Sequence, residues 1–219
     1  MELNVSEALR YLGVRGAPDP ALLSQLSAAA DRLARAAPPR WVWRAYPLAF
    51  GPEGPALEGA GLALPGEMAA RMLGGCAQAA VLICTLGAVF EALLRAEQAR
   101  GMARAALLDA CGSAWVEAGC DGAQAEISAR FPGLHPTDRF SPGYGDLPLS
   151  LQRDICGALD APRRLGVQVT DSLLLNPSKT VTAVIGLSDR PQPARIRGCA
   201  YCDLRENCQY RKGGTTCGA

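Results

Sequence analysis

The sequence predicts an α+β fold, because segments with helical and with strand patterns follow one another along the chain. Apolar residues recur at spacings of three and four, as on one face of an amphipathic helix: Leu22, Leu23, Leu26, Ala29, Ala30, Leu33 and Ala37. Residues 41–48 are rich in aromatic and branched side chains, and residues 79–86 are almost all apolar, which is typical of strands. With 219 residues, 49% of them hydrophobic and 20% charged, the chain has the composition of a globular protein.

Local signals define the predicted helices. Residues 5–12 are predicted to be helical up to Gly13. The next helix has Asp19 as its N-cap, Pro20 as its first residue and Pro38 as its stop signal. A helix at 89–100 is predicted to end at Gly101, and a long helix is expected from about 103 to 130.

Strands and turns fill the intervals between these helices. Two further strands are predicted at 167–175 and 180–187, joined as a hairpin through residues 176–179. Turns with a short hairpin are expected at 51–61, and a loop at 138–146. We therefore divide the chain into an N-terminal helical section, 1–40, an α+β core, 41–188, and a cysteine-rich tail, 189–219.

Charge and hydropathy exclude several classes of partner. Twenty-two Lys and Arg residues against 21 Asp and Glu give a net charge of +1, which provides no basic field for nucleic acid or an anionic membrane. The N-terminus carries acids where a secretory signal carries bases, and no apolar run approaches the roughly 20 residues that cross a bilayer. We expect a cytoplasmic protein with no nucleic-acid or membrane partner.

The long predicted helix carries a polar stripe. Four polar side chains follow one another at intervals of four: Asp109, Ser113, Glu117 and Asp121. The inward face of the same helix is expected to consist of Leu107, Leu108, Cys111 and Trp115. From periodicity alone, the stripe is either a solvated surface, which is the more common case, or part of a binding site.

Residues 139–144, Arg-Phe-Ser-Pro-Gly-Tyr, predict a turn that could bind a ligand. Pro142 and Gly143 suit the centre of a type II turn, because proline fixes one dihedral angle and glycine accepts a positive φ. Such a turn holds Arg139 and Tyr144 close together, and a guanidinium fork beside an aromatic ring suits an amino-acid-like ligand. The alternative is a structural turn with Arg139 at the surface.

These residues resemble the Arg-x-x-Pro-Gly-Tyr signature of the S-adenosylmethionine-binding activation domain of cobalamin-dependent methionine synthase. Residues 170–182 look like that family's Thr-Glu-Ser, apolar run, x-Pro-x-x-Ser-Val-Ser segment. Residues 109–118 are similar to the family helix with a ligand-binding glutamate, and Glu117 falls on that glutamate. Because residues 5–48 look like the amino end of stand-alone versions of the domain, the resemblance is to a stand-alone homologue.

The resemblance implies a fold and a set of ligand contacts. The implied fold is a twisted, mainly antiparallel sheet flanked by helices. Arg139 is expected to bind the methionyl carboxylate of S-adenosylmethionine, and Glu117 its cationic amino or sulfonium end. The backbone at Ser141 and Gly143 is expected to bind the adenosine portion, and Tyr144 to lie where the ligand and the corrin meet.

The function that the resemblance implies is reductive reactivation. One electron and a methyl group from S-adenosylmethionine return oxidised cob(II)alamin to methylcobalamin. Since nothing in the sequence resembles a cobalamin-binding module, the cobalamin is expected on a partner, either a methionine synthase that lacks its own activation domain or a related corrinoid protein. The implied electron donor is a flavodoxin or ferredoxin. Whether the chain counts as an enzyme, of the methyltransferase class, depends on the definition, because the reacting corrinoid belongs to the partner.

No catalytic residue is assigned. His135, the sole histidine, precedes Pro136 in a predicted loop. Methyl transfer from a sulfonium to a metal-centred nucleophile needs no proton transfer, so we give this histidine no acid-base role.

The tail predicts a metal centre. Four of the nine cysteines fall within 19 residues of the C-terminal segment: Cys199, Cys202, Cys208 and Cys217. Four thiolates suit either tetrahedral zinc or an iron-sulfur cluster, and free or regulatory thiols are the alternative. We favour iron-sulfur slightly, because reactivation needs an electron, and we expect this tail near the ligand. The other cysteines are expected in the core: Cys76, Cys84, Cys111, Cys120 and Cys156.

Two further functions stay open beside reactivation. The chain could be an iron-sulfur electron-transfer module without S-adenosylmethionine binding. It could also be a metal-stapled interaction protein for a corrinoid methyltransferase, with no chemistry of its own.

Overall fold

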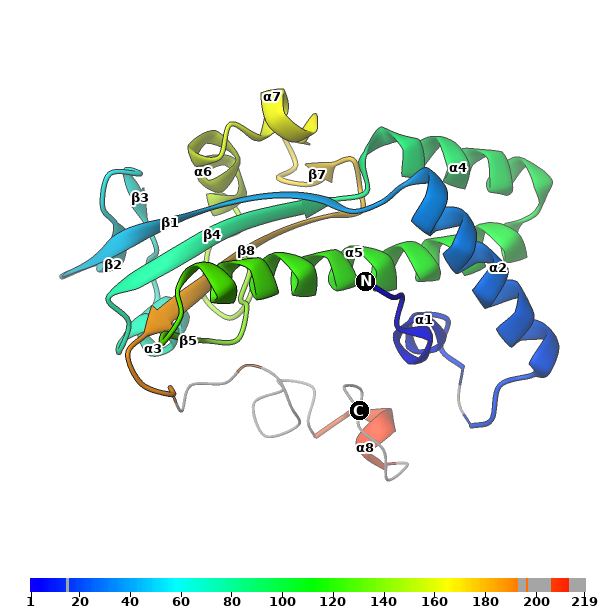
Figure 1. Cartoon of the computed structure of the whole chain (residues 1–219), viewed down its shortest axis with the longest axis horizontal. Coiled ribbons are helices and arrows are strands. Elements are labelled where there is room, and N and C mark those ends of the chain that lie inside the picture. The colour runs from blue at the N-terminus through cyan, green and yellow to red at the C-terminus, as the bar shows by residue number, and fades with distance from the viewer. Residues whose placement is uncertain (15, 193–195, 197–205, 213–219) are drawn as a thin grey trace. The chain divides into compact units, whose positions relative to one another are not determined.

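The structure, a computed structural model, describes residues 1–14, 16–192, 196 and 206–212 (Figure 1). Its main element is a six-stranded sheet in the order β3-β2-β1-β4-β8-β5. The strands are β1 (Arg40–Gly51), β2 (Gly54–Leu57), β3 (Leu62–Ala63), β4 (Gln78–Thr85), β5 (His135–Pro136) and β8 (Thr180–Ser188). The pairs β1–β2, β2–β3 and β5–β8 are antiparallel. The prediction of an α+β fold with a mainly antiparallel sheet is confirmed.

Helices alternate with the strands along the described part of the chain. They are α1 (Val5–Tyr11), α2 (Pro20–Ala36), α3 (Glu67–Leu73), α4 (Gly87–Arg100), α5 (Met102–Arg130), α6 (Leu151–Ala158), α7 (Ala161–Leu165) and α8 (Gln209–Lys212). The predicted ends of α1, α2, α4 and α5 hold within two residues, and Asp19 caps α2 by accepting a hydrogen bond from Ala21 N at 2.9 Å. Within the described ranges, no helix is both long and apolar enough to cross a membrane.

The chain folds into two compact units, each drawn from three segments. Unit 1 consists of Met1–Arg44, Leu82–Ile127 and Gln152–Thr182. Unit 2 consists of Ala45–Val81, Ser128–Leu151 and Ala183–Ala219. The division into 1–40, 41–188 and 189–219 stays a prediction.

The core of unit 1 forms where α5 packs against β4. Gly119 of α5 lies so close to the strand that a Cβ built there would be 2.6 Å from Cys84 Sγ and 2.5 Å from Pro39 Cβ. Trp115, which was predicted to face inward, is buried and donates its indole N–H to the Ala37 carbonyl at 3.1 Å. Gly112 likewise admits the buried Phe90 ring, so glycines let neighbouring elements approach α5 closely.

A buried carboxylate joins two helices of unit 1. The side chain of Glu97 in α4 is 7% exposed and accepts hydrogen bonds from Arg32 of α2 at 2.5 Å and from Arg100 at 2.8 Å. The Arg32 guanidinium, followed by that of Arg100, lowers the pKa of Glu97. Burying a carboxylate is costly unless it is paired with a cation, and the two arginines supply this pairing.

The predicted hairpin of 167–175 with 180–187 is wrong: the strand at 180–187 is confirmed as β8, but it lies between β4 and β5 and does not pair with the segment before it. That region forms two short strands, β6 (Gln168–Val169) and β7 (Leu175–Asn176), which pair with each other in a separate two-stranded sheet. Leu173 has a φ of 64°, and Thr170 Oγ1 accepts a hydrogen bond from Leu174 N at 3.0 Å. This side-chain bond turns the backbone and ends the extended conformation.

Other elements were not predicted at all. Residues 135–136, expected in a loop, form β5, with His135 exposed and opposite Ser188 of β8. The helices α3, α6 and α7 have five to eight residues each, too few for a clear apolar period.

Candidate functional site

Residues 139–144 of unit 2, the 139–144 loop, form the predicted turn. Tyr144 N donates to Ser141 O at 3.0 Å, and Gly143 has a φ of 93°, which only glycine adopts without strain. Gly143 N donates in turn to Leu147 O at 2.8 Å, and Leu147 N donates to Tyr144 O at 3.0 Å. The type II turn centred on Pro142 and Gly143 is thus confirmed, and it is closed by backbone bonds on both sides.

The loop is joined to the main sheet at one residue. The backbone of Phe140 pairs with that of Val184 in β8, with N–O distances of 3.1 and 2.8 Å, and the Phe140 ring is fully buried. This bridge holds the backbone on both sides of Phe140, at Arg139 and at Ser141. The sheet therefore supports the loop at the point where the predicted ligand-binding residues begin.

Arg139 and Tyr144 differ sharply in exposure. Arg139 is 7% exposed, whereas Tyr144 is 51% exposed. The alternative of a structural turn with a surface arginine is therefore wrong in its second part, because this guanidinium is buried. A buried guanidinium requires hydrogen-bond acceptors around it, and a ligand carboxylate suits its planar fork.

Asp146 fastens the end of this turn to α3. Its carboxylate accepts hydrogen bonds from the backbone N–H groups of Glu67 at 2.6 Å and Met68 at 3.0 Å. The hydrogen bond from Met68, followed by that from Glu67, lowers the pKa of Asp146. Gly66 precedes the helix, and a Cβ there would lie 2.7 Å from the carboxylate, so glycine is required for this contact. This cap could not be predicted from local sequence signals, because Asp146 is 79 residues from Glu67.

Glu117 lies on α5 in unit 1 and is half-buried. Its electrostatic neighbour is Tyr11 of α1: burial raises the pKa of Tyr11, and the negative charge of Glu117 raises it further. The Arg10 guanidinium lies 4.4 Å from the centre of the Tyr11 ring and is held by Glu7 at 2.6 Å. The N-terminal helix thus contributes an aromatic group near Glu117, with a cation stacked on that ring, which periodicity did not reveal.

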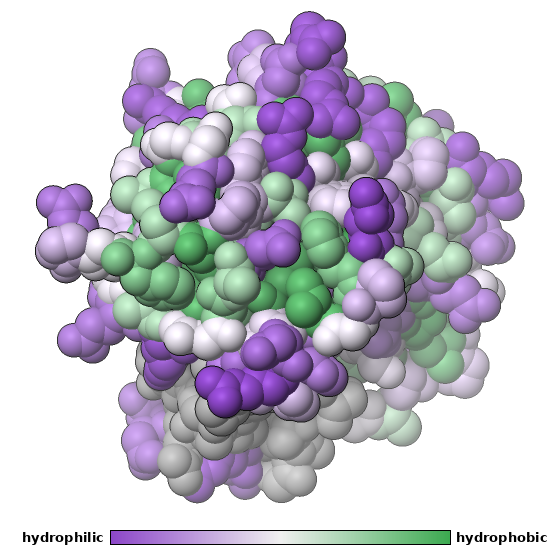
Figure 2. All heavy atoms as spheres, turned by 60° about the vertical axis from the view of Figure 1, so that its left-hand side comes forward, coloured by the Kyte–Doolittle hydropathy of each residue, from purple (hydrophilic) through white to green (hydrophobic). Residues whose placement is uncertain are grey.

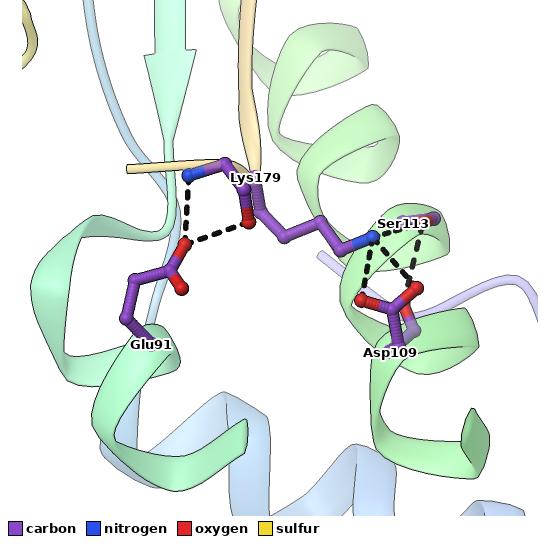
Figure 3. Close-up of polar contacts among 5 residues, drawn as sticks. Glu91, Asp109, Ser113 and Lys179 are labelled. Atoms are coloured by element: carbon purple, nitrogen blue, oxygen red, sulfur yellow. Dashed lines mark hydrogen bonds and ion pairs between the residues drawn. The ribbon is translucent and has the colours of Figure 1, made fainter. Parts of the chain in front are cut away.

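The rest of the polar stripe is not simply solvated. Lys179 Nζ lies 3.0 Å from the Asp109 carboxylate and 2.8 Å from Ser113 Oγ (Figure 3). Beside it, Ser178 donates its backbone N–H and its hydroxyl to Glu91 of α4, at 2.7 and 2.6 Å. Two segments on which the resemblance rests, 109–118 and 170–182, are therefore in direct contact. Asp121 is exposed.

Apolar side chains also reach the surface of unit 2. Phe50 is 54% exposed, Tyr144 51% and Leu149 37%. Leu149 Cδ1 lies 3.3 Å from the position of a Cβ on Gly143, so this leucine borders the 139–144 loop. Figure 2 shows apolar side chains gathered on one face of the molecule and surrounded by hydrophilic ones. A mixed surface of this kind is typical of a contact area for another molecule.

The cysteines fall into two groups. Those expected in the core are buried and not in disulfides: Cys76, Cys84, Cys111, Cys120 and Cys156. Burial raises the pKa of the thiols of Cys76, Cys111 and Cys156 to about 11.

Of the four predicted metal ligands, Cys199, Cys202 and Cys217 lie outside the described residues, and Cys208 is a partly exposed free thiol. Among the residues that the structure describes, no three His, Cys, Asp or Glu side chains are grouped so that they could hold a metal ion. The metal centre of the tail stays a prediction.

Comparisons with known proteins support one fold. No family model matches the chain, and no curated protein matches it. A crystal structure of the MetH reactivation domain bound to AdoHcy (S-adenosylhomocysteine) is similar, with a TM-score of 0.65 and 13% sequence identity. The match covers 98% of this chain and 82% of that one. The chain has the fold of that domain over nearly its whole length.

Proposed function

We propose that this protein binds S-adenosylmethionine and supports the reductive methylation of cob(II)alamin on a separate corrinoid methionine synthase. The observation that carries the proposal is the likeness in fold to a MetH reactivation domain bound to AdoHcy. S-adenosylhomocysteine is what remains of S-adenosylmethionine once its methyl group has been transferred. The fold therefore has a member that holds the product of the proposed reaction.

The 139–144 loop supplies the chemistry for such a ligand. The buried Arg139 fork suits the methionyl carboxylate. Gly143 has no side chain, so the backbone there and at Ser141 can approach the adenosine closely. We assign the cationic amino or sulfonium end of the ligand to Glu117, whose negative charge complements it.

In this proposal the corrinoid is bound to a partner protein. One electron reduces cob(II)alamin to cob(I)alamin. The reduced cobalt then attacks the sulfonium methyl group, so that methylcobalamin forms and S-adenosylhomocysteine leaves. The electron donor is a flavodoxin or ferredoxin, and the partner is a methionine synthase that lacks this domain, or a related corrinoid protein. The exposed Tyr144 and Leu149 offer an apolar contact for that partner. The proposal places the protein in the cytoplasm.

Calorimetry with S-adenosylmethionine tests the first step. We expect a saturable one-to-one isotherm with S-adenosylmethionine, and competition by S-adenosylhomocysteine, because both carry the carboxylate that Arg139 is proposed to bind. ATP, which shares the adenosine but lacks the methionyl carboxylate, is the matched control and should give no heat of specific binding. A flat isotherm with S-adenosylmethionine would contradict the proposal and favour an electron-transfer module or an interaction protein.

The tail is proposed to bind a metal, either an iron-sulfur cluster or zinc. Anaerobically prepared protein is expected to contain stoichiometric metal, and a Cys202→Ser, Cys208→Ser double variant is expected to lose it, because thiolates are the ligands. Visible absorption would identify iron-sulfur, whereas zinc is colourless. A Cys76→Ser variant is the control, since that thiol is buried in the core. Less than about a tenth of an equivalent of metal in the wild type would leave the tail cysteines as free or regulatory thiols.

A further inference from the structure

The ammonium group of Lys179 makes contacts with α5 that have no part in the ligand contacts proposed above. Its side chain is 16% exposed, and its ammonium group lies 3.0 Å from the Asp109 carboxylate and 2.8 Å from Ser113 Oγ. The Ser113 hydroxyl itself donates to the Asp109 carbonyl at 3.2 Å, which leaves its lone pairs for the ammonium. The ammonium thus spans one full turn of α5, from Asp109 to Ser113.

The backbone around Lys179 is held by two other elements, β4 and α4. Lys179 O accepts a hydrogen bond from Leu86 N, at the end of β4, at 3.0 Å. Thr180 Oγ1 lies 2.7 Å from Thr85 Oγ1, and the Ser178 hydroxyl donates to Glu91 of α4 at 2.6 Å. Because the turn before β8 is fastened in this way, the Lys179 ammonium is a fixed point relative to the core of unit 1.

The contact lies one helical turn from the predicted ligand residue on the same helix. Ser113 and Glu117 are four residues apart, which in an α-helix places them on the same face and about 6 Å apart along the axis. A helix held at Asp109 and Ser113 can neither rotate nor slide at that turn. The Lys179 contact thus restrains the polar face of α5 that carries Glu117, while Trp115 and Gly119 hold the opposite, buried face.

We propose that Lys179 is a positioning residue for S-adenosylmethionine binding, which it controls by fixing the face of α5 that carries Glu117. This inference rests on the proposed function. Lys179 acts through Asp109 and Ser113, and it does not itself contact the ligand.

A purely electrostatic role and a positioning role of Lys179 predict opposite effects on S-adenosylmethionine affinity when the ammonium group is removed. S-adenosylmethionine carries a net positive charge, so removing a nearby cation would by electrostatics alone leave its binding unchanged or strengthen it. If Lys179 positions Glu117, removing the ammonium weakens binding. The sign of the effect therefore separates the two roles.

The experiment compares Lys179→Met with Lys179→Arg by calorimetry with S-adenosylmethionine. We expect Lys179→Met to weaken binding by about 5- to 30-fold and Lys179→Arg to restore part of it, because arginine can again reach Asp109. Arg163→Met is the matched control: it removes an exposed ion pair with Asp160 in the same unit and should leave affinity within about twofold. If Lys179→Met is unstable, Ser113→Ala removes one of the contacts and should give a smaller loss in the same direction.

A double-mutant cycle separates positioning from a general loss of stability. In a Glu117→Gln background, Lys179→Met should cause little further loss of affinity, because the residue through which it acts is already disabled. Full additivity of the two losses, or a Lys179→Met variant that binds as well as the wild type, would overturn the inference. Absence of binding by the wild type would instead overturn the proposed function itself, and this inference with it.

Discussion

Arg139→Ala is expected to weaken binding of S-adenosylmethionine by about 1.5–3 kcal/mol, which is about 10- to 150-fold in the dissociation constant. Arg139 is 7% exposed and directly precedes Phe140, whose backbone is paired with β8. The backbone beside Arg139 is therefore held and its side chain is buried before a ligand arrives, so little of the binding energy is lost to ordering this side chain. Calorimetry on the variant and the wild type measures the difference.

Two controls make this result specific. Arg139→Lys keeps the positive charge but removes the planar fork, so it should recover only part of the affinity. Arg130→Ala removes an exposed arginine from the same unit and should bind like the wild type. An Arg139→Ala variant that is folded and binds with unchanged affinity would show that the loop does not hold the ligand carboxylate.

Gly119→Ala is expected to lower the free energy of unfolding by about 2–3 kcal/mol, although it adds only one methyl group. The new Cβ would lie 2.5 Å from Pro39 Cβ and 2.6 Å from Cys84 Sγ, and both neighbours belong to packed parts of the core. Either α5 or β4 must shift to relieve the overlap. For a chain of this size the melting temperature should fall by about 5–10 °C, which calorimetric unfolding measures.

Gly157→Ala is the matched control for this prediction. Gly157 is also a glycine within a helix, α6, but a Cβ there would meet no atom within 4 Å. Alanine should therefore stabilise the protein by about 0.5–1 kcal/mol through its higher helix propensity. Equal effects of the two substitutions would contradict close packing at Gly119.

Elements with local signals could be predicted from the sequence, whereas elements held by distant residues could not. Asp19 and Pro20 mark the start of α2, and Gly101 marks the end of α4, because caps and breakers act within one turn. The seven-residue α3 instead takes its cap from Asp146, which is remote in the sequence. Residues 167–175 have strand-like composition, but the Thr170 side chain bonds back to Leu174 N and bends the segment.

The same distinction applies to the candidate site. The turn at Pro142 and Gly143 was predictable, because proline and glycine restrict their own dihedral angles. The burial of Arg139 was not, since it depends on the packing around the loop. Lys179 was also missed: its partners Asp109 and Ser113 lie 70 and 66 residues away, and periodicity along α5 shows only that these two share a face.

The interleaving of the two units has a consequence for how such a protein can be inherited and rearranged. The chain passes between unit 1 and unit 2 five times, at Arg44, Val81, Ile127, Leu151 and Thr182. No continuous stretch of the gene therefore encodes either unit. A recombination event or a deletion cannot transfer or remove one unit without cutting into the other. The fold is thus expected to be gained, fused to another protein or lost only as a whole, which makes it a single genetic module despite its two structural parts.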